Sequence, residues 1–201
     1  MQGKTHLVTG TALALFLLCP SERGALVAGA GVAAIGSVIS DIDEDHSKSH
    51  SGTVKTGAVL IGIICILILL DRVLKLDLLG YVRSMEAMSS PGSVALICLV
   101  LLICFGILSP HRSFMHSFIG MVLTGLCVRG LLPELYVYYL IGFASHLLLD
   151  FFNKKGEMLF YPLRARFCIG ICRAGGFVDS VLFTAGFAAL TIVVYRLVTG
   201  R

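Results

Sequence analysis

Residues 93–117 read SVALICLVLLICFGILSPHRSFMHS, an apolar run that gives way to a proline, two histidines and an arginine. The run from 93 to 108 carries no charged side chain, and such a segment satisfies its backbone hydrogen bonds within a bilayer by forming a helix. The polar residues after it would then lie at the membrane edge. The same sequence of features, an apolar run followed by histidine, recurs along the chain.

The composition indicates an integral membrane protein. Hydrophobic residues make up 57% of the 201 residues and charged residues 14%, with a mean hydropathy of +0.92, which is too little polar surface for a soluble globule. The apolar runs lie at 7–18, 24–39, 54–70, 93–108, 117–132, 135–149 and 177–195. Several are shorter than the roughly 20 residues that span a bilayer, so these runs must draw on flanking polar residues or end inside a hydrated cavity. We predict an all-α polytopic bundle of about seven helices in one integral membrane domain, residues 1–201.

The predicted topology brings the histidines to one membrane face. If the helices alternate in direction, the N-terminus and the ends of the second, fourth and sixth helices emerge on the same side. Those places hold His6, residues 41–50, residues 111–116 and residues 146–150, and they contain all six histidines. We therefore expect imidazole and carboxylate groups, the usual ligands of a hydrolytic metal site, to gather at this face.

Local spacing supports shared ligands. His146 and Asp150 are four residues apart on a predicted helix, so both project from one face and could hold one cation, or form a structural hydrogen bond. Asp41 and Asp43 follow a helix of small residues. Both could face an ion, or one could orient a ligand histidine, the alternative being a solvated helix end.

His111, Arg112 and His116 form a second candidate group. Pro110 tends to end the preceding helix, so His111 in the loop and His116 in the next helix's first turn could converge. Arg112 presents a planar set of donors suited to a phosphate oxygen, or it anchors the helix at the membrane interface. Segment 153–176 is rich in Lys and Arg and is predicted to be a solvated basic loop that contacts anionic lipid headgroups.

The motifs together resemble the YdjM-like family of membrane-bound metal-dependent hydrolases. The resemblance spans nearly the whole chain and rests on Thr5-His6, Asp41-Ile42-Asp43, His111-Arg112-x-x-x-His116-Ser117, and His146-x-x-x-Asp150 followed by Asn153, Gly156 and Phe160-Tyr161-Pro162. The family is distantly similar to zinc-dependent phospholipases C and P1-type nucleases. The chain departs from the pattern at Ser40, where the family usually has proline, and it lacks a second His-x-x-x-Glu pair.

The resemblance implies a site and an activity in a bacterial inner membrane. The implied metal ligands are His6, Asp41 or Asp43, His116 or His111, His146 and Asp150, with one or two ions, expected to be zinc. The implied reaction is hydrolysis of a phosphoester in a membrane lipid. The metal would activate water and Arg112 would stabilise the developing charge. Asp43, or whichever of Asp41 and Asp43 is not a ligand, would accept the proton, with His111 a further catalytic candidate.

Two other functions compete with this one. A metal-independent lipid phosphatase that forms a phosphohistidine would fit His146-x-x-x-Asp150, but the Ser-Arg expected before the histidine is replaced by residues 143–145, Phe-Ala-Ser. A transporter or non-catalytic metal-binding protein would favour polar residues near the bilayer midplane, whereas the helix centres here are almost purely apolar. Nucleic acid is not expected as a partner, because the net charge of +4 is small and no basic face with interleaved aromatics occurs.

Overall fold

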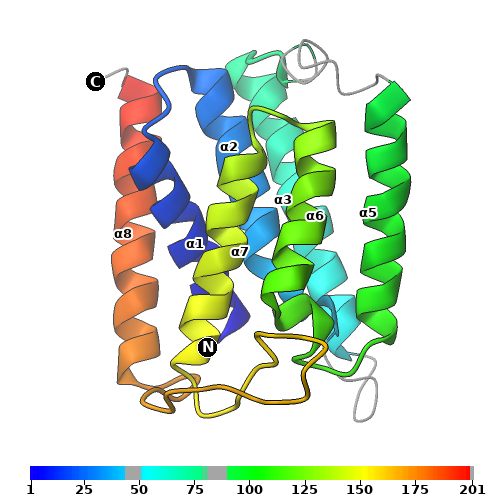
Figure 1. Ribbon diagram of the computed structural model, residues 1–201. Coiled ribbons are helices and arrows are strands. Elements are labelled where there is room, and N and C mark those ends of the chain that lie inside the picture. The colour runs from blue at the N-terminus through cyan, green and yellow to red at the C-terminus, as the bar shows by residue number, and fades with distance from the viewer. Residues whose placement is uncertain (44–50, 79, 81–89, 200–201) are drawn as a thin grey trace.

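The computed structural model describes residues 1–43, 51–78, 80 and 90–199, and these residues form a bundle of seven long helices (Figure 1). In chain order the elements are α1 (Gly3–Leu18), α2 (Arg23–Val38), the 3-10 turn η1 (Ile39–Asp43), α3 (Ser51–Leu74), α5 (Ser90–Leu108), the 3-10 turn η2 (Phe114–His116), α6 (Phe118–Leu131), α7 (Tyr136–Phe151) and α8 (Phe177–Thr199). The all-α prediction is therefore confirmed. The largest difference is α3, which continues beyond the predicted apolar run 54–70 because polar residues at both of its ends remain helical.

Helices α2 and α7 make the most extensive helix–helix contact among the described elements, at the centre of the bundle. A Cβ added at Gly142 of α7 would lie 2.2 Å from the carbonyl oxygen of Ala33 in α2, and one added at Gly36 of α2 would lie 2.4 Å from the carbonyl oxygen of Tyr139. Only glycine permits two backbones to approach this closely, as in other helix pairs packed through small residues. This contact fixes α7 against the end of α2, where the candidate ligands lie.

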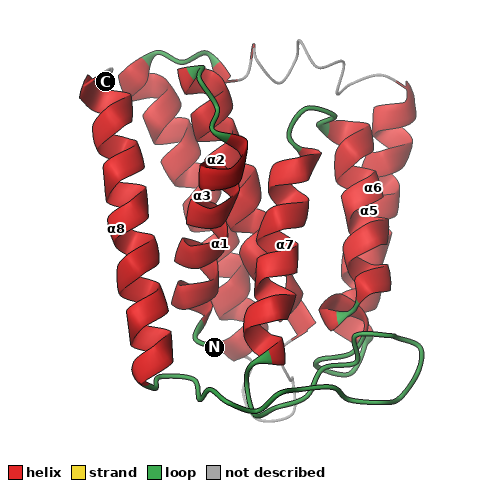
Figure 2. Ribbon diagram, turned by 60° about the vertical axis from the view of Figure 1, so that its left-hand side comes forward, coloured by secondary structure: helices red, strands yellow, loops and turns green. Residues whose placement is uncertain are grey.

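The remaining helices surround this pair. Helix α1 packs against α2, α7 and α8, whereas α5 packs against α6 on the other side of the bundle (Figure 2). Outward-facing positions carry large apolar side chains such as Ile61 in α3, Leu101 in α5 and Phe187 in α8. Such a surface is suited to lipid rather than water.

The helices alternate in direction, as predicted. The N-terminus, η1, η2, the end of α7 and the start of α8 all lie at one end of the bundle, next to the long connection 152–176 (Figure 1). We call this the site end. Among the described residues, Arg23–Ile42 and Phe177–Arg196 are long and apolar enough to cross a membrane, and four other apolar helices are shorter.

Candidate metal centre

His146 is held at the site end in one defined tautomer. It is fully buried, and its Nδ1 lies 2.7 Å from the carbonyl oxygen of Ser37 at the end of α2. Because a carbonyl oxygen can only accept, Nδ1 carries the proton and Nε2 keeps its lone pair. A backbone carbonyl in this role is a common second partner of a metal-binding histidine, so His146 has the form that a metal requires.

Asp41, His116 and His146 direct one ligand atom each toward a common point. The separations are 3.4 Å between the Nε2 atoms of His146 and His116, 3.7 Å from His116 Nε2 to Asp41 Oδ1, and 3.6 Å from His146 Nε2 to Asp41 Oδ1. The nearest point equidistant from the three atoms, in their common plane, lies about 2.1 Å from each, which is the usual Zn–N and Zn–O distance. The donor set and its spacing therefore fit a zinc ion with three protein ligands.

Local hydrogen bonds position His116. Ser117 forms the N-cap of α6, accepting from the backbone N–H of Gly120 at 3.1 Å and donating to the carbonyl oxygen of Phe114 at 2.6 Å. These bonds close the η2 turn, so that fully buried His116 points toward η1. Two short 3-10 turns, η1 and η2, thus bring Asp41 and His116 to the histidine of α7.

His6, His146 and Asp150 form a second group of possible ligands that shares His146 with the first. His6 Nε2 lies 3.1 Å from Asp150 Oδ1, and the His6 ring stacks on the His146 ring at a centroid distance of 4.0 Å. His146 has a single free nitrogen, because Nδ1 donates to Ser37. The two groups therefore cannot each bind their own ion through His146, and one ion there is the simpler arrangement.

Arg112 is buried beside Asp150 and is not an interfacial anchor. Its Nη2 donates to Asp150 Oδ2 at 2.5 Å and its Nη1 to the carbonyl oxygen of Lys155 at 2.8 Å, and the residue is only 7% exposed. Its φ of 62° lies in the left-handed region, which costs a non-glycine residue about 1–3 kcal/mol. The two hydrogen bonds from Nη1 and Nη2 hold the guanidinium between Asp150 and the Lys155 carbonyl oxygen. The interpretation as an arginine that reaches out to lipid headgroups is thereby excluded.

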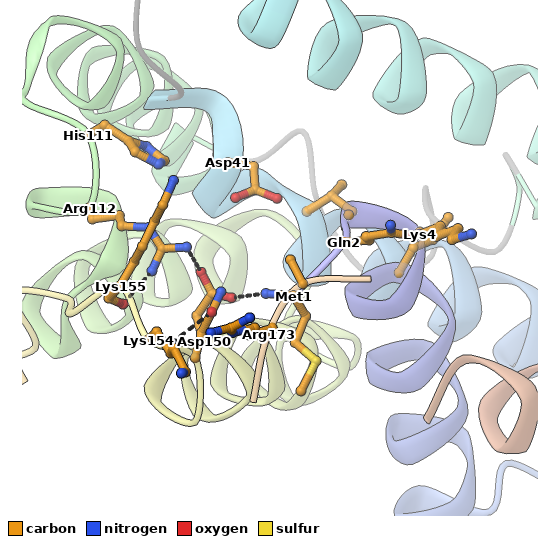
Figure 3. A pocket seen from close by; sticks show the side chains of 15 residues that line it. Met1, Gln2, Lys4, Asp41, His111, Arg112, Asp150, Lys154, Lys155 and Arg173 are labelled. Carbon is orange, nitrogen blue, oxygen red and sulfur yellow. Dashed lines mark hydrogen bonds and ion pairs between the residues drawn. The ribbon is translucent and has the colours of Figure 1, made fainter. Parts of the chain in front are cut away.

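A pocket of about 700 Å³ opens above these residues, which is in the usual range for a small-molecule site (Figure 3). Asp41 and Asp150 reach its wall, whereas His6, His116 and His146 do not line it and are fully buried. The amino group of Met1 also reaches the pocket and lies 2.5 Å from Asp150 Oδ1. The other polar lining comes from Gln2, Lys4, His111, Arg112, Asn153, Lys154, Lys155 and Arg173. A ligand in the pocket would therefore meet the carboxylates directly.

Glu157 is a residue near the site that the sequence did not indicate. It is fully buried, and neither carboxylate oxygen has a hydrogen-bond partner among the described residues. Burial raises the pKa of this carboxyl to about 8. Its backbone pairs with Phe167, and the next residue donates to the carbonyl oxygen of Arg112 at 3.1 Å. The neighbouring Gly156 permits this pairing, because a Cβ there would lie 2.9 Å from that of Arg166.

Comparison with known proteins places the chain in a family. A model of the YdjM inner membrane protein family matches residues 1–200. The chain belongs to this family. Membership agrees with the predicted location in the inner membrane. No curated protein and no solved structure matches the chain.

The structure of this YdjM-family protein brings most of the predicted site residues together. His6, Asp41, His116, His146 and Asp150 share one cluster, with Arg112 in contact with Asp150. His111 lines the pocket, with its ring centroid 5.4 Å from that of His116. The side chain of Asp43 lies outside the described residues, as do His46 and His50. Segment 153–176, predicted as a solvated basic loop, is exposed over much of its length but contributes Lys154, Lys155 and Arg173 to the pocket.

Proposed function

We propose that this YdjM-family protein is a membrane-embedded, metal-dependent hydrolase that cleaves a phosphoester of a lipid. The observation that carries the proposal is the triangle of Asp41 Oδ1, His116 Nε2 and His146 Nε2, with sides of 3.4–3.7 Å, beside a pocket of about 700 Å³. Three protein ligands would suit a catalytic zinc ion, since structural zinc sites are closed by four protein ligands, and Asp41 joins this ligand set to the pocket wall.

The chemistry divides between the ion and the residues of the pocket. A zinc ion held by these ligands would lower the pKa of its bound water and polarise a phosphoryl oxygen. Arg112 supplies a guanidinium at the pocket wall, and Asp150 fixes its orientation through the 2.5 Å contact. Arginine in such a position stabilises the negative charge that develops on the phosphoryl group. Asp43 remains the predicted proton acceptor, and His111 is the histidine that lines the pocket.

The surroundings of the site favour a lipid substrate. The pocket lies at one end of a bundle whose outer positions are apolar, so a phosphate headgroup can enter it while the hydrocarbon chains stay beside the helices. Figure 3 shows the polar side chains converging on this one region from several elements.

A phosphohistidine mechanism is less well supported by the geometry. A nucleophilic histidine must reach the phosphorus atom, but His146 is fully buried, lies outside the pocket lining and has Nε2 directed at Asp41 and His116. A metal ligand requires this orientation, and a nucleophile requires a more open one.

The test is metal analysis combined with lipid hydrolysis on the full chain in nanodiscs. We expect about one zinc ion per chain, loss of hydrolysis on chelation and recovery when zinc is restored. Asp41→Asn should lose both metal and activity. Asp77→Asn, an exposed carboxylate at the opposite end of α3, should retain both. Hydrolysis that survives chelation but requires His146 would replace this proposal with the phosphohistidine mechanism.

A further inference from the structure

The pocket carries more positive charge than the proposed hydrolysis requires. Arg112, Lys154, Lys155 and Arg173 all line it. The lining holds two carboxylates, Asp41 and Asp150, which these four cationic side chains outnumber, and Asp150 already pairs with Arg112 and with the amino group of Met1. The potential of the pocket is therefore positive before any metal binds, and it becomes more positive with a divalent cation.

These cations form an inner and an outer layer. Arg112 is buried and held by two hydrogen bonds, whereas Lys154, Lys155 and Arg173 are exposed at the rim. Lys155 links the layers, because its carbonyl oxygen accepts from Arg112 while its side chain extends past Arg112 toward His111 (Figure 3). Lys4 is excluded from the rim set because its ammonium lies over the ring of Phe183, 5.1 Å from the centroid. Lys154, Lys155 and Arg173 together form the rim cluster.

The two layers suit two anionic groups on one ligand. The inner guanidinium lies beside Asp150, where the proposed function places the phosphoester that is attacked. A headgroup that ends in a quaternary ammonium would bring a cation to the rim cluster, and like charges at a binding site cost several kcal/mol. A second phosphate at the rim would instead meet three basic side chains.

Resting on the proposed function, we infer that the lipid headgroup carries a second phosphate beyond the cleaved phosphoester, and that the rim cluster binds it. The shared chemistry is a pair of phosphate groups on one headgroup, either linked as a diphosphate or separated by a short polyol. The volume of about 700 Å³ accommodates both. Zwitterionic headgroups are the class that this site rejects.

Binding to the metal-free protein tests the inference without relying on hydrolysis. The full chain in phosphatidylcholine nanodiscs, with chelator and near-physiological salt, is titrated calorimetrically with inorganic pyrophosphate, glycerol 1,3-bisphosphate, inorganic phosphate and phosphocholine. We expect at least one of the two bisphosphate probes to bind tenfold or more tightly than phosphocholine and than single phosphate. The stronger of the two identifies the preferred spacing of the phosphates. Equal binding of that probe and phosphocholine would overturn the inference.

A charge-matched control separates the rim cluster from general attraction. The triple variant Lys154→Ala, Lys155→Ala, Arg173→Ala should weaken binding of the preferred probe at least tenfold. The control Arg23→Ala, Arg72→Ala, Lys75→Ala removes the same charge from exposed positions at the opposite end of the bundle and should change binding less than twofold. Equal weakening in both variants would also overturn the inference.

The outcomes for the two proposals are distinguishable. If a bisphosphate binds through the rim cluster but no lipid is hydrolysed with zinc restored, the hydrolase proposal fails and the binding site stands. If zinc-dependent hydrolysis is found but the rim variant cleaves a lipid diphosphate with the wild-type KM, the inference about the headgroup fails and the hydrolase stands.

Discussion

Glu157 should make the free energy of unfolding depend on pH, and Glu157→Gln should remove that dependence. Burial raises the pKa of this carboxyl from an ordinary value of 4.5 to about 8. Below pH 4.5 the carboxyl is protonated in both the folded and the unfolded chain, so it does not lower the free energy of unfolding. Between pH 4.5 and about 8 the unfolded chain releases the proton while the folded chain retains it, and the free energy of unfolding therefore falls.

The size of the effect follows from the two pKa values. The difference between 4.5 and about 8 corresponds to a loss of up to about 5 kcal/mol, at 1.36 kcal/mol per pKa unit. The loss is complete above pH 8, where the folded chain is ionised as well. Solvent screening does not reduce it much, because Glu157 is fully buried.

Unfolding in mixed micelles measures this directly. The chain has no tryptophan, so helicity by circular dichroism is followed as SDS is added, from pH 5 to 8.5 with chelator present. The wild-type free energy should fall by several kcal/mol more than that of Glu157→Gln over this range. Glu22→Gln, an exposed glutamate between α1 and α2, should follow the wild-type curve. Parallel pH curves for wild type and Glu157→Gln would refute the reasoning.

Three further substitutions test the site and the fold. Arg112→Lys keeps the charge but loses the planar fork whose two Nη atoms reach Asp150 and the Lys155 carbonyl oxygen separately. Initial rates should therefore fall at least tenfold with metal content unchanged, and full turnover would remove Arg112 from the mechanism. His146→Ala removes the residue that belongs to both groups of possible metal ligands, so zinc affinity in equilibrium dialysis should fall by at least about 100-fold while the protein still inserts. Full zinc occupancy in this variant would show that His146 is structural. Gly142→Ala forces α2 and α7 apart and should destabilise the chain by about 1–3 kcal/mol in the SDS assay. The control Gly62→Ala should not destabilise it, because an added Cβ there meets open space.

The sequence by itself determined the helices and the end of the bundle at which the ligands meet. Apolar runs specify helices because a bilayer leaves the backbone no other way to satisfy its hydrogen bonds. Alternation then requires His6, Asp41, His116 and His146 to lie at one end, because each is separated from the next by an even number of helix crossings. The pairing of His146 and Asp150 on one face likewise follows from the helical period.

Only the tertiary structure decided which atoms face one another. The tautomer of His146 depends on the carbonyl of Ser37, which α2 brings to α7 from 109 residues away in the chain. Arg112 is buried rather than extended to headgroups because the connection after α7 folds back and supplies the Lys155 carbonyl. The same connection encloses Glu157. Burial and hydrogen-bond partners of a loop residue are properties of the surfaces that close around it, and local sequence does not encode those surfaces.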